Sequence, residues 1–219
     1  MIDIHRLDLP DADFIGALTA VNDSIAIVSS SINQKIANSI AEDMSVNILS
    51  VNADTDFFGL FSKMNNNGLI LSNIIDDEIY NQLKRELSIN VSILDSKINA
   101  VGANILANDK IAIVNPSYNE RSRRAIADAL DTEVISMRIG RFKTVGATNL
   151  LNNKNIVVNN TATDSDIEIL KSYGLDPVRA SSNGGSFSLG LSLLINTNHI
   201  IIGRSTTGYE VAKILEAFD

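Results

Sequence analysis

The run Val101-Gly102-Ala103-Asn104-Ile105-Leu106-Ala107-Asn108-Asp109-Lys110-Ile111-Ala112-Ile113-Val114-Asn115-Pro116 contains the pattern that decides the fold. Two apolar segments flank a polar turn at 108–110, where Asn and Asp favour tight backbone turns. The glycine of this run recurs at spacings of 43, 43, 44 and 44 residues, at Gly16, Gly59, Gly102, Gly146 and Gly190. Six residues after each glycine comes an asparagine: Asn22, Asn65, Asn108, Asn152 and Asn196. The chain is therefore a fivefold repeat, and a repeat of this length dictates the architecture.

One repeat predicts a strand, a turn, a strand, a helix and a further strand. In the third repeat the first strand is expected over 101–107, including the glycine, and the second over 111–114. Residues 120–130 carry a helical pattern, with Ile126 and Leu130 four positions apart on one face. Residues 132–137 form the closing strand, and the other four repeats show the same succession.

The repeats predict a closed ring of the α/β class, a pseudo-fivefold αβ-propeller of five ββαβ units. The fifth repeat ends at Asp219 without its last strand, whereas Met1 to Leu7 precede the first repeat and belong to none. The N-terminal segment is therefore expected to complete the last unit and remove an open sheet edge. We expect one domain over 1–219, with repeats at about 14–56, 57–99, 100–143, 144–187, and 188–219 plus 1–8. An all-β propeller is rejected, because every repeat has an amphipathic helix and the chain has no Trp.

Composition limits the chemistry and suggests the kind of partner. With no Cys, the chain has neither disulfides nor thiolate metal sites nor a cysteine nucleophile. No signal peptide and no membrane-spanning run is visible, so a cytoplasmic protein is expected. The net charge is −8, and residues 1–100 hold 14 acidic and six basic residues while the remainder holds 12 of each. This balance disfavours wrapping nucleic acid and suits a basic protein partner, although plain solubility explains it equally well.

The remaining motifs indicate loops rather than catalytic, cofactor or metal sites. The two histidines, His5 and His199, lack a metal-ligand spacing. Asn183-Gly184-Gly185-Ser186 lacks the features of a phosphate loop and predicts a tight turn. Acidic residues before the repeat glycines, at 11, 13, 54 and 56, are better explained as solvated loop charge than as a cation site. The repeated asparagines are expected to be structural, because a catalytic residue is needed once rather than five times.

One stretch breaks the fivefold symmetry by its charge. Residues 121–143 hold six basic residues against three acidic ones. The basic residues are Arg121, Arg123, Arg124, Arg138, Arg141 and Lys143. They form a candidate contact patch, and the alternative is an ordinary solvated helix face.

The chain resembles the archaeal and eukaryotic translation initiation factor 6 family over its whole length. The resemblance is carried by 68–73, 101–104, 108–116, Ala127-Asp128-Ala129-Leu130 with Glu133-Val134, Val145-Gly146-Ala147-Thr148-Asn149, and Gly203-Arg204-Ser205-Thr206-Thr207-Gly208. It implies the pentein fold, which is the ring derived above. A second pentein branch, the amidino-group hydrolases and transferases, uses a nucleophilic Cys, so the absence of Cys excludes that mechanism here.

The resemblance also implies a partner and a function. A family member is expected to bind the large (50S) ribosomal subunit on its intersubunit face, through large-subunit ribosomal protein 14 near the sarcin-ricin loop. It would thereby block joining of the small (30S) subunit, and it would take part in large-subunit biogenesis. We expect a monomer without cofactor, DNA or membrane partner. The expected ribosome-binding residues are Leu60, Ala103 and Asn104, just after two repeat glycines, and Arg121, Arg124, Arg138 and Arg141 of the basic patch.

Two alternatives remain open from the sequence. An enzyme using carboxylates and His199 would need a deep axial pocket where acidic side chains converge. A general RNA-binding module would act through the patch at 121–143 and would bind with a strong salt dependence.

Overall fold

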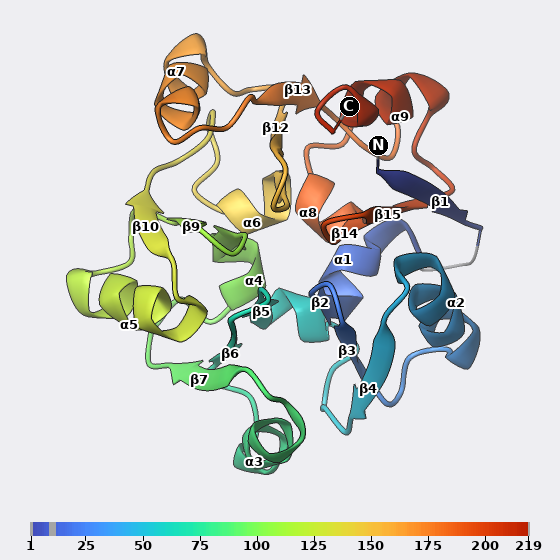
Figure 1. Cartoon of the computed structure of the whole chain (residues 1–219), viewed down its shortest axis with the longest axis vertical. Helices are drawn as coiled ribbons and strands as arrows, with labels where there is room; N and C mark the ends of the chain where they lie inside the picture. Colours follow the sequence, from blue (N-terminus) through green and yellow to red (C-terminus); the bar gives the residue numbers. More distant parts are fainter. Residues whose placement is uncertain (1, 9–11, 219) are drawn as a thin grey trace.

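The computed structural model describes residues 2–8 and 12–218, which form five three-stranded sheets around a common axis (Figure 1). In every sheet the first two strands are antiparallel, and the third is parallel to the second. The strands are β2 (Thr19–Val21), β3 (Ile25–Ser29) and β4 (Asn47–Val51); β5 (Ser62–Met64), β6 (Gly68–Ser72) and β7 (Asn90–Leu94); β8 (Ile105–Ala107), β9 (Ile111–Val114) and β10 (Glu133–Ser136); β11 (Leu150–Leu151), β12 (Ile156–Asn159) and β13 (Val178–Ala180); and β14 (Leu194–Ile195), β15 (His199–Gly203) and β1 (Asp3–Leu7). The predicted ring of ββαβ units is confirmed.

One long helix per unit lies on the outside of the ring (Figure 1). These helices are α2 (Gln34–Met44), α3 (Asp77–Glu86), α5 (Glu120–Leu130), α7 (Asp164–Ser172) and α9 (Gly208–Leu215). Each begins after a side chain that accepts a hydrogen bond from the first turn: Asn33, Asp76, Asn119, Thr163 and Thr207. Such caps satisfy amide groups that the helix itself leaves free, and so they fix where each helix starts.

The prediction of a strand at the repeat glycines is wrong. Residues 101–104 form a one-turn helix, α4, and only Ile105–Ala107 are extended as β8. The equivalent turns are η1 (Ala12–Phe14) with α1 (Ile15–Leu18), η2 (Phe58–Leu60), α6 (Val145–Thr148) and α8 (Leu189–Ser192). They surround the axis in Figure 1. Their glycines explain the change: a Cβ on each repeat glycine would collide with the carbonyl oxygen of the preceding one around the ring.

The N-terminal segment closes the ring as predicted. β1 pairs with β15 in parallel register, from Asp3 opposite His199 to Leu7 opposite Gly203. Arg6 strengthens this joint, because its guanidinium donates to the carbonyl oxygens of Arg204 and Thr206 at 2.9 Å each. Met1, which belonged to the predicted strand, lies outside the described residues.

The hydrophobic core is divided into clusters that each bridge two neighbouring units. One cluster joins Ile113 and Ile135 of the third unit to Val158 and Leu170 of the fourth. Another joins Leu7 and Ile201 of the last unit to helix α2 of the first. A single unit would expose half of such a cluster, so the units depend on one another for burial.

Candidate interaction surface

The strand directions give the ring two faces of different character. The first strand of each unit runs from the repeat glycine to the repeat asparagine, and the second returns. We call the two ends the glycine face and the asparagine face. Since the third strand is parallel to the second, every loop that enters a long helix or the next unit lies at the glycine face. The asparagine face carries the short hairpin turns and the ends of the long helices.

The repeated asparagines hold the asparagine face together. The side-chain oxygen of each accepts two backbone amides of its own turn, as Asn108 does from Lys110 and Ile111 at 2.9 Å each. The amide groups of Asn22, Asn65, Asn108 and Asn152 each donate to the backbone carbonyl of the next repeated asparagine. At the last junction Asn196 donates instead to the carbonyl of Met44, at the end of α2. The structure thus gives these side chains a structural role.

A second polar ring follows one residue later, at Asp23, Asn66, Asp109, Asn153 and Thr197. Asn66 donates to both Asp23 and Asp109 at 2.7 Å. Asn153 donates to Asp109 and to the Thr197 hydroxyl, which in turn donates to Asp23. Because five is an odd number, side chains that only accept and side chains that only donate cannot alternate strictly around this closed ring. The Thr197 hydroxyl, which accepts from one neighbour and donates to the other, resolves this mismatch.

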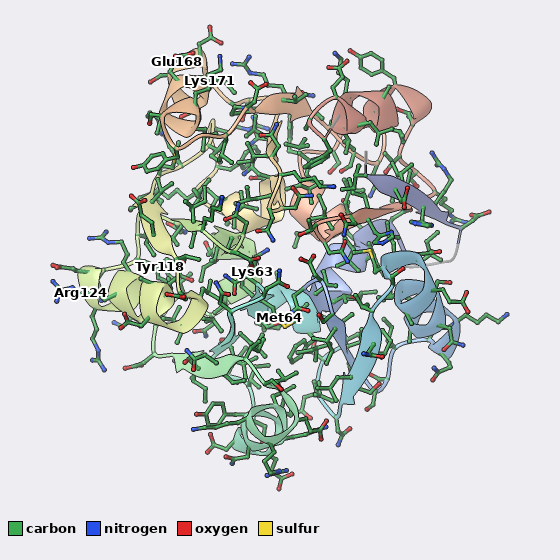
Figure 2. All side chains as sticks on the ribbon, viewed as in Figure 1. Lys63, Met64, Tyr118, Arg124, Glu168 and Lys171 are labelled. Carbon is green, nitrogen blue, oxygen red and sulfur yellow. The ribbon has the colours of Figure 1, made fainter. Side chains whose placement is uncertain are left out.

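The axis of the ring contains a small cavity with one unusual side chain. The cavity has a volume of about 90 Å³. The fourth residue after each repeat glycine lines it, and these residues are Ala20, Lys63, Leu106, Leu150 and Leu194. Figure 2 shows Lys63 near the centre of the ring. Desolvation by burial lowers the pKa of this lysine from 10.5 to about 8.

The axial cavity does not have the features that the enzyme alternative predicts. Asp23 and Asp109 are the acidic side chains that line it, and both are held in the polar ring. Neither histidine lines it. His5 and His199 lie instead at the joint of β1 and β15, with ring centroids 5.7 Å apart, and His5 is 3.3 Å from Asp43. His5 is half-buried. Over residues 2–8 and 12–218, no group of three or more His, Cys, Asp or Glu side chains could hold a metal ion.

The glycine face divides by charge. We call the loop and helix-start carboxylates of the first two units the acidic sector: Asp13, Asp54, Asp56, Asp76, Asp77 and Glu78. We call the cations of the third unit the basic sector: Arg121, Arg124, Arg138, Arg141 and Lys143. All five of these cations are exposed. Asp11, a further loop carboxylate of the sequence, lies outside the described residues.

The structure separates the expected contact residues into accessible and buried ones. Leu60 is half-buried beside the axis, whereas Ala103 and Asn104 are each only 5% exposed. Asn104 donates to the carbonyl of Ala100 and accepts from Asn115, so its polar groups are used inside the unit. These two side chains therefore offer a partner almost no accessible surface in the folded ring. A substitution there would act by disturbing the packing beneath the glycine face.

The arginines of the patch differ in how they are held. Arg121 lies 3.6 Å from Asp95 of the neighbouring unit, and Arg124 pairs with Glu120 one turn earlier in α5. The guanidinium of Arg141 lies 5.0 Å from the ring centroid of Phe142 and 4.9 Å from that of Phe187. Arg138 is exposed and forms no ion pair within residues 2–8 and 12–218.

The apolar side chains of the glycine face were not predicted from the sequence. Phe14 is 52% exposed, Phe57 47% and Ile74 53%. A signal was present, because Phe14 and Phe57 stand two residues before their repeat glycines, where the other units have Ala100, Thr144 and Ser188. Because these exposed apolar groups differ between units, they are not part of the repeated scaffold.

The comparisons with known proteins agree with this architecture. A model described as the eIF-6 family matches residues 4–217. The chain is 36% identical over 122 residues to translation initiation factor 6 of Thermoplasma acidophilum, covering 55% of this chain and 56% of that protein. It is 28% identical over 221 residues to translation initiation factor 6 of Pyrococcus horikoshii, covering 98% and 97%. In the Thermoplasma alignment the chain thus spans little more than half the length of its relative. No helix in the described residues is long and apolar enough to cross a membrane.

Solved structures resemble the ring at low sequence identity. DDAH from Pseudomonas aeruginosa, in a mutant complexed with citrulline, matches with a TM-score of 0.51 and 12% identity, covering 78% of this chain and 69% of that chain. An amidinotransferase from Microseira wollei, of the saxitoxin biosynthetic pathway, matches with a TM-score of 0.57 and 12% identity, covering 82% and 66%. These likenesses show the pentein-like α/β fold alone. Since the family model covers nearly the whole chain, the chain belongs to the eIF-6 family.

Proposed function

We propose that this protein binds the large (50S) ribosomal subunit on its intersubunit face and sterically prevents association with the small (30S) subunit. Membership of the eIF-6 family is the observation that carries the proposal. The contact is with large-subunit ribosomal protein 14, in the vicinity of the sarcin-ricin loop. The factor acts in the cytoplasm as a monomer, without catalysis, and takes part in large-subunit biogenesis.

The glycine face is the docking face in this proposal. Both polar rings run through all five units of the asparagine face, and their side chains hydrogen-bond to one another and to the neighbouring turns. The glycine face differs between units in loop sequence, charge and exposed apolar groups. Its acidic sector suits a basic ribosomal protein, and its basic sector suits ribosomal RNA.

Sedimentation with purified subunits tests the proposal. The protein should co-sediment with isolated large subunits, be absent from joined ribosomes, and reduce joining in proportion to its occupancy. Replacing Arg141 and Arg138 with Glu should weaken co-sedimentation. Lys154→Glu, a charge reversal on the asparagine face, should leave co-sedimentation with the large subunit unchanged. Co-sedimentation with small subunits alone would contradict the proposal.

A general RNA-binding module is a second candidate, favoured by the contact of the Arg141 guanidinium with the rings of Phe142 and Phe187. Such a cluster could bind bases by stacking and phosphates by charge. Binding of an unrelated RNA oligomer would then be as tight as binding of the large subunit, and both would weaken steeply with salt. A flat salt dependence, or a strong preference for the subunit, rejects this candidate.

A further inference from the structure

A groove with acidic walls lies at the junction of the first and second units. It has a volume of about 930 Å³. One wall is the loop after β4, at 52–55, and the other is the exposed side of α3. Apolar side chains line the space between the walls, with Phe61 half-buried and Ile75 and Ile79 buried. Ile74 stands at the rim and is 53% exposed.

The charges of this groove are unbalanced. Its walls carry four exposed carboxylates and one guanidinium, and these are Asp54, Asp76, Glu78, Glu86 and Arg85. Within residues 2–8 and 12–218, none of the four carboxylates lies within ion-pair distance of a cation. The negative charge of the walls is therefore available to an external cation.

The next junction around the ring has the opposite arrangement. A shift of 43 residues carries Asn52 onto Asp95 and Glu78 onto Arg121. Asp95 and Arg121 both line the groove between the second and third units, and they lie 3.6 Å apart across it. That groove supplies its own cation. At the first junction the arginine is replaced by a glutamate and its partner by a neutral amide.

We propose that the groove between the first and second units binds a basic peptide segment, in which lysines or arginines flank one aliphatic side chain. The aliphatic side chain would cover Phe61, Ile74 and Ile79, and the cations would meet the carboxylates of both walls. Glu78 and Glu86 are separated by about 12 Å along the helix axis, which an extended peptide spans in about four residues. Cations spaced at that interval match the groove.

This inference deepens the proposed function and rests on it for the source of the segment, a protein of the large subunit. Nucleic acid is a poor occupant, because phosphates would meet four carboxylates. A second copy of this chain could offer its basic sector instead, and the experiment below includes that outcome.

Fluorescence anisotropy with a labelled nine-residue peptide tests the groove without ribosomes. The probe has a central Leu and lysines on both sides, and its partner probe has Ser in place of Leu. Glu78→Arg should weaken binding of the Leu probe about tenfold. Adding Asn52→Asp recreates the ion pair of the next junction and should abolish binding. Asp77→Arg is the matched control: it makes the same charge change in the same helical turn, outside the groove, and should cost about threefold at most.

Apolar contact is tested by Ile74→Ser, which changes an exposed side chain and should leave the fold intact. It should weaken binding of the Leu probe and leave the Ser probe unaffected. If Glu78→Arg and Asp77→Arg lowered the affinity for the Leu probe equally, or if the unchanged protein bound both probes equally well, the groove would not be the binding site. The attraction would then be due to net charge alone. Concentration-dependent dimers in sedimentation equilibrium, abolished by Glu78→Arg, would overturn the peptide in favour of a second copy.

Large-subunit co-sedimentation separates this inference from the proposed function. Peptide binding without co-sedimentation would refute the proposed function and retain the groove as a peptide site. Unchanged co-sedimentation of the Asn52→Asp, Glu78→Arg protein would refute the groove as the ribosomal contact and leave the proposed function standing.

Discussion

Glu210 shows how a single buried carboxylate can fix a loop. It is 4% exposed and accepts hydrogen bonds from the backbone of Thr207, Gly184 and Gly185. The hydroxyls of Ser181 and Thr207 also donate to it. The two glycines have φ of +73° and +102°, so the loop takes a conformation that only glycine adopts without strain. The tight turn predicted at 183–186 is confirmed, but the residue that holds it lies 24 positions beyond Ser186 and could not be assigned from the sequence.

Replacing Glu210 with Gln should destabilise the protein by about 2 kcal/mol at neutral pH. Desolvation raises the pKa of Glu210, but the hydrogen bonds from Thr207, Gly185 and Ser181 outweigh it and lower the pKa from 4.5 to about 2. Because the folded-state pKa is the lower one, this stabilisation is complete above pH 4.5 and is lost as the pH falls towards 2. Urea unfolding at several pH values measures the difference. Glu216→Gln, at an exposed ion pair with Lys213, should change stability little at any pH.

Lys63 is the opposite case, a charge that the fold disfavours. Three of the four equivalent positions around the axis carry Leu, so Lys63→Leu should fit the ring and raise stability by roughly 2 kcal/mol at pH 7. The pKa of Lys63 is lowered to about 8 in the folded state, so the unfolded state binds its proton more tightly. The penalty is therefore complete below pH 8 and disappears as the pH rises to about 10.5. A stability gain independent of pH from 7 to 10.5 would contradict this account.

At the scale of the elements, the one-turn helices show where sequence patterns stop being informative. Residues 101–107 are mostly apolar and carry no cap signal, so a strand was the natural prediction. The helical turn follows from contacts between units, since Gly102 packs against the backbone of Gly59 and Ser62. The regular spacing of the glycines predicts that they share a role. The geometry of that role depends on the neighbouring unit of the ring, which no single segment contains.

Gly102→Ala should therefore be severely destabilising, by at least about 3 kcal/mol. A methyl group there would meet backbone oxygens, which cannot turn aside as a side chain could. Gly208 provides a matched control, because it also lies in the first turn of a helix and a Cβ there would meet nothing within 4 Å. Gly208→Ala should be neutral or slightly stabilising. Thermal unfolding of both variants by circular dichroism gives the comparison, and similar melting temperatures would refute the packing argument.

The expected contact residues also divide at this scale. The charges of α5 and of the loop at 137–144 were visible in the sequence, and the structure exposes them. The burial of Ala103 and Asn104 was not visible, because it depends on their being in a helical turn rather than a strand. The sequence contains part of the information about the groove at the first junction. Aligning the repeats places Glu78 at the position of Arg121 and Asn52 at the position of Asp95. Only the folded ring shows that Glu78 and Asn52 line the same groove.

At the scale of the whole molecule, the ring must close both in its strand pairing and in its side-chain hydrogen bonds. The unpaired last repeat predicted that the N-terminal strand would complete the sheet, and β1 does so. The polar ring at Asp23, Asn66, Asp109, Asn153 and Thr197 had no comparable signal. Neighbouring turns of this ring are joined by side chains 43 or 44 residues apart, and its final link joins Thr197 to Asp23 across 174 residues.

Thr197 is the position at which this polar ring can be broken with the least change in shape. Thr197→Val keeps the volume but removes the hydroxyl that accepts from Asn153 and donates to Asp23, so it should cost about 1 to 2 kcal/mol. Thr197→Asp should cost more at neutral pH, because it places a third carboxylate directly beside Asp23. One of the two acids would then retain a proton more readily, so the penalty should shrink as the pH falls below about 5. Thr197→Asn supplies both a donor and an acceptor and should restore most of the stability at every pH. Urea unfolding of the three variants at pH 4 and pH 7 measures these differences. If Thr197→Asp and Thr197→Val lost the same stability at both pH values, the alternation of donors and acceptors would not be what closes the ring.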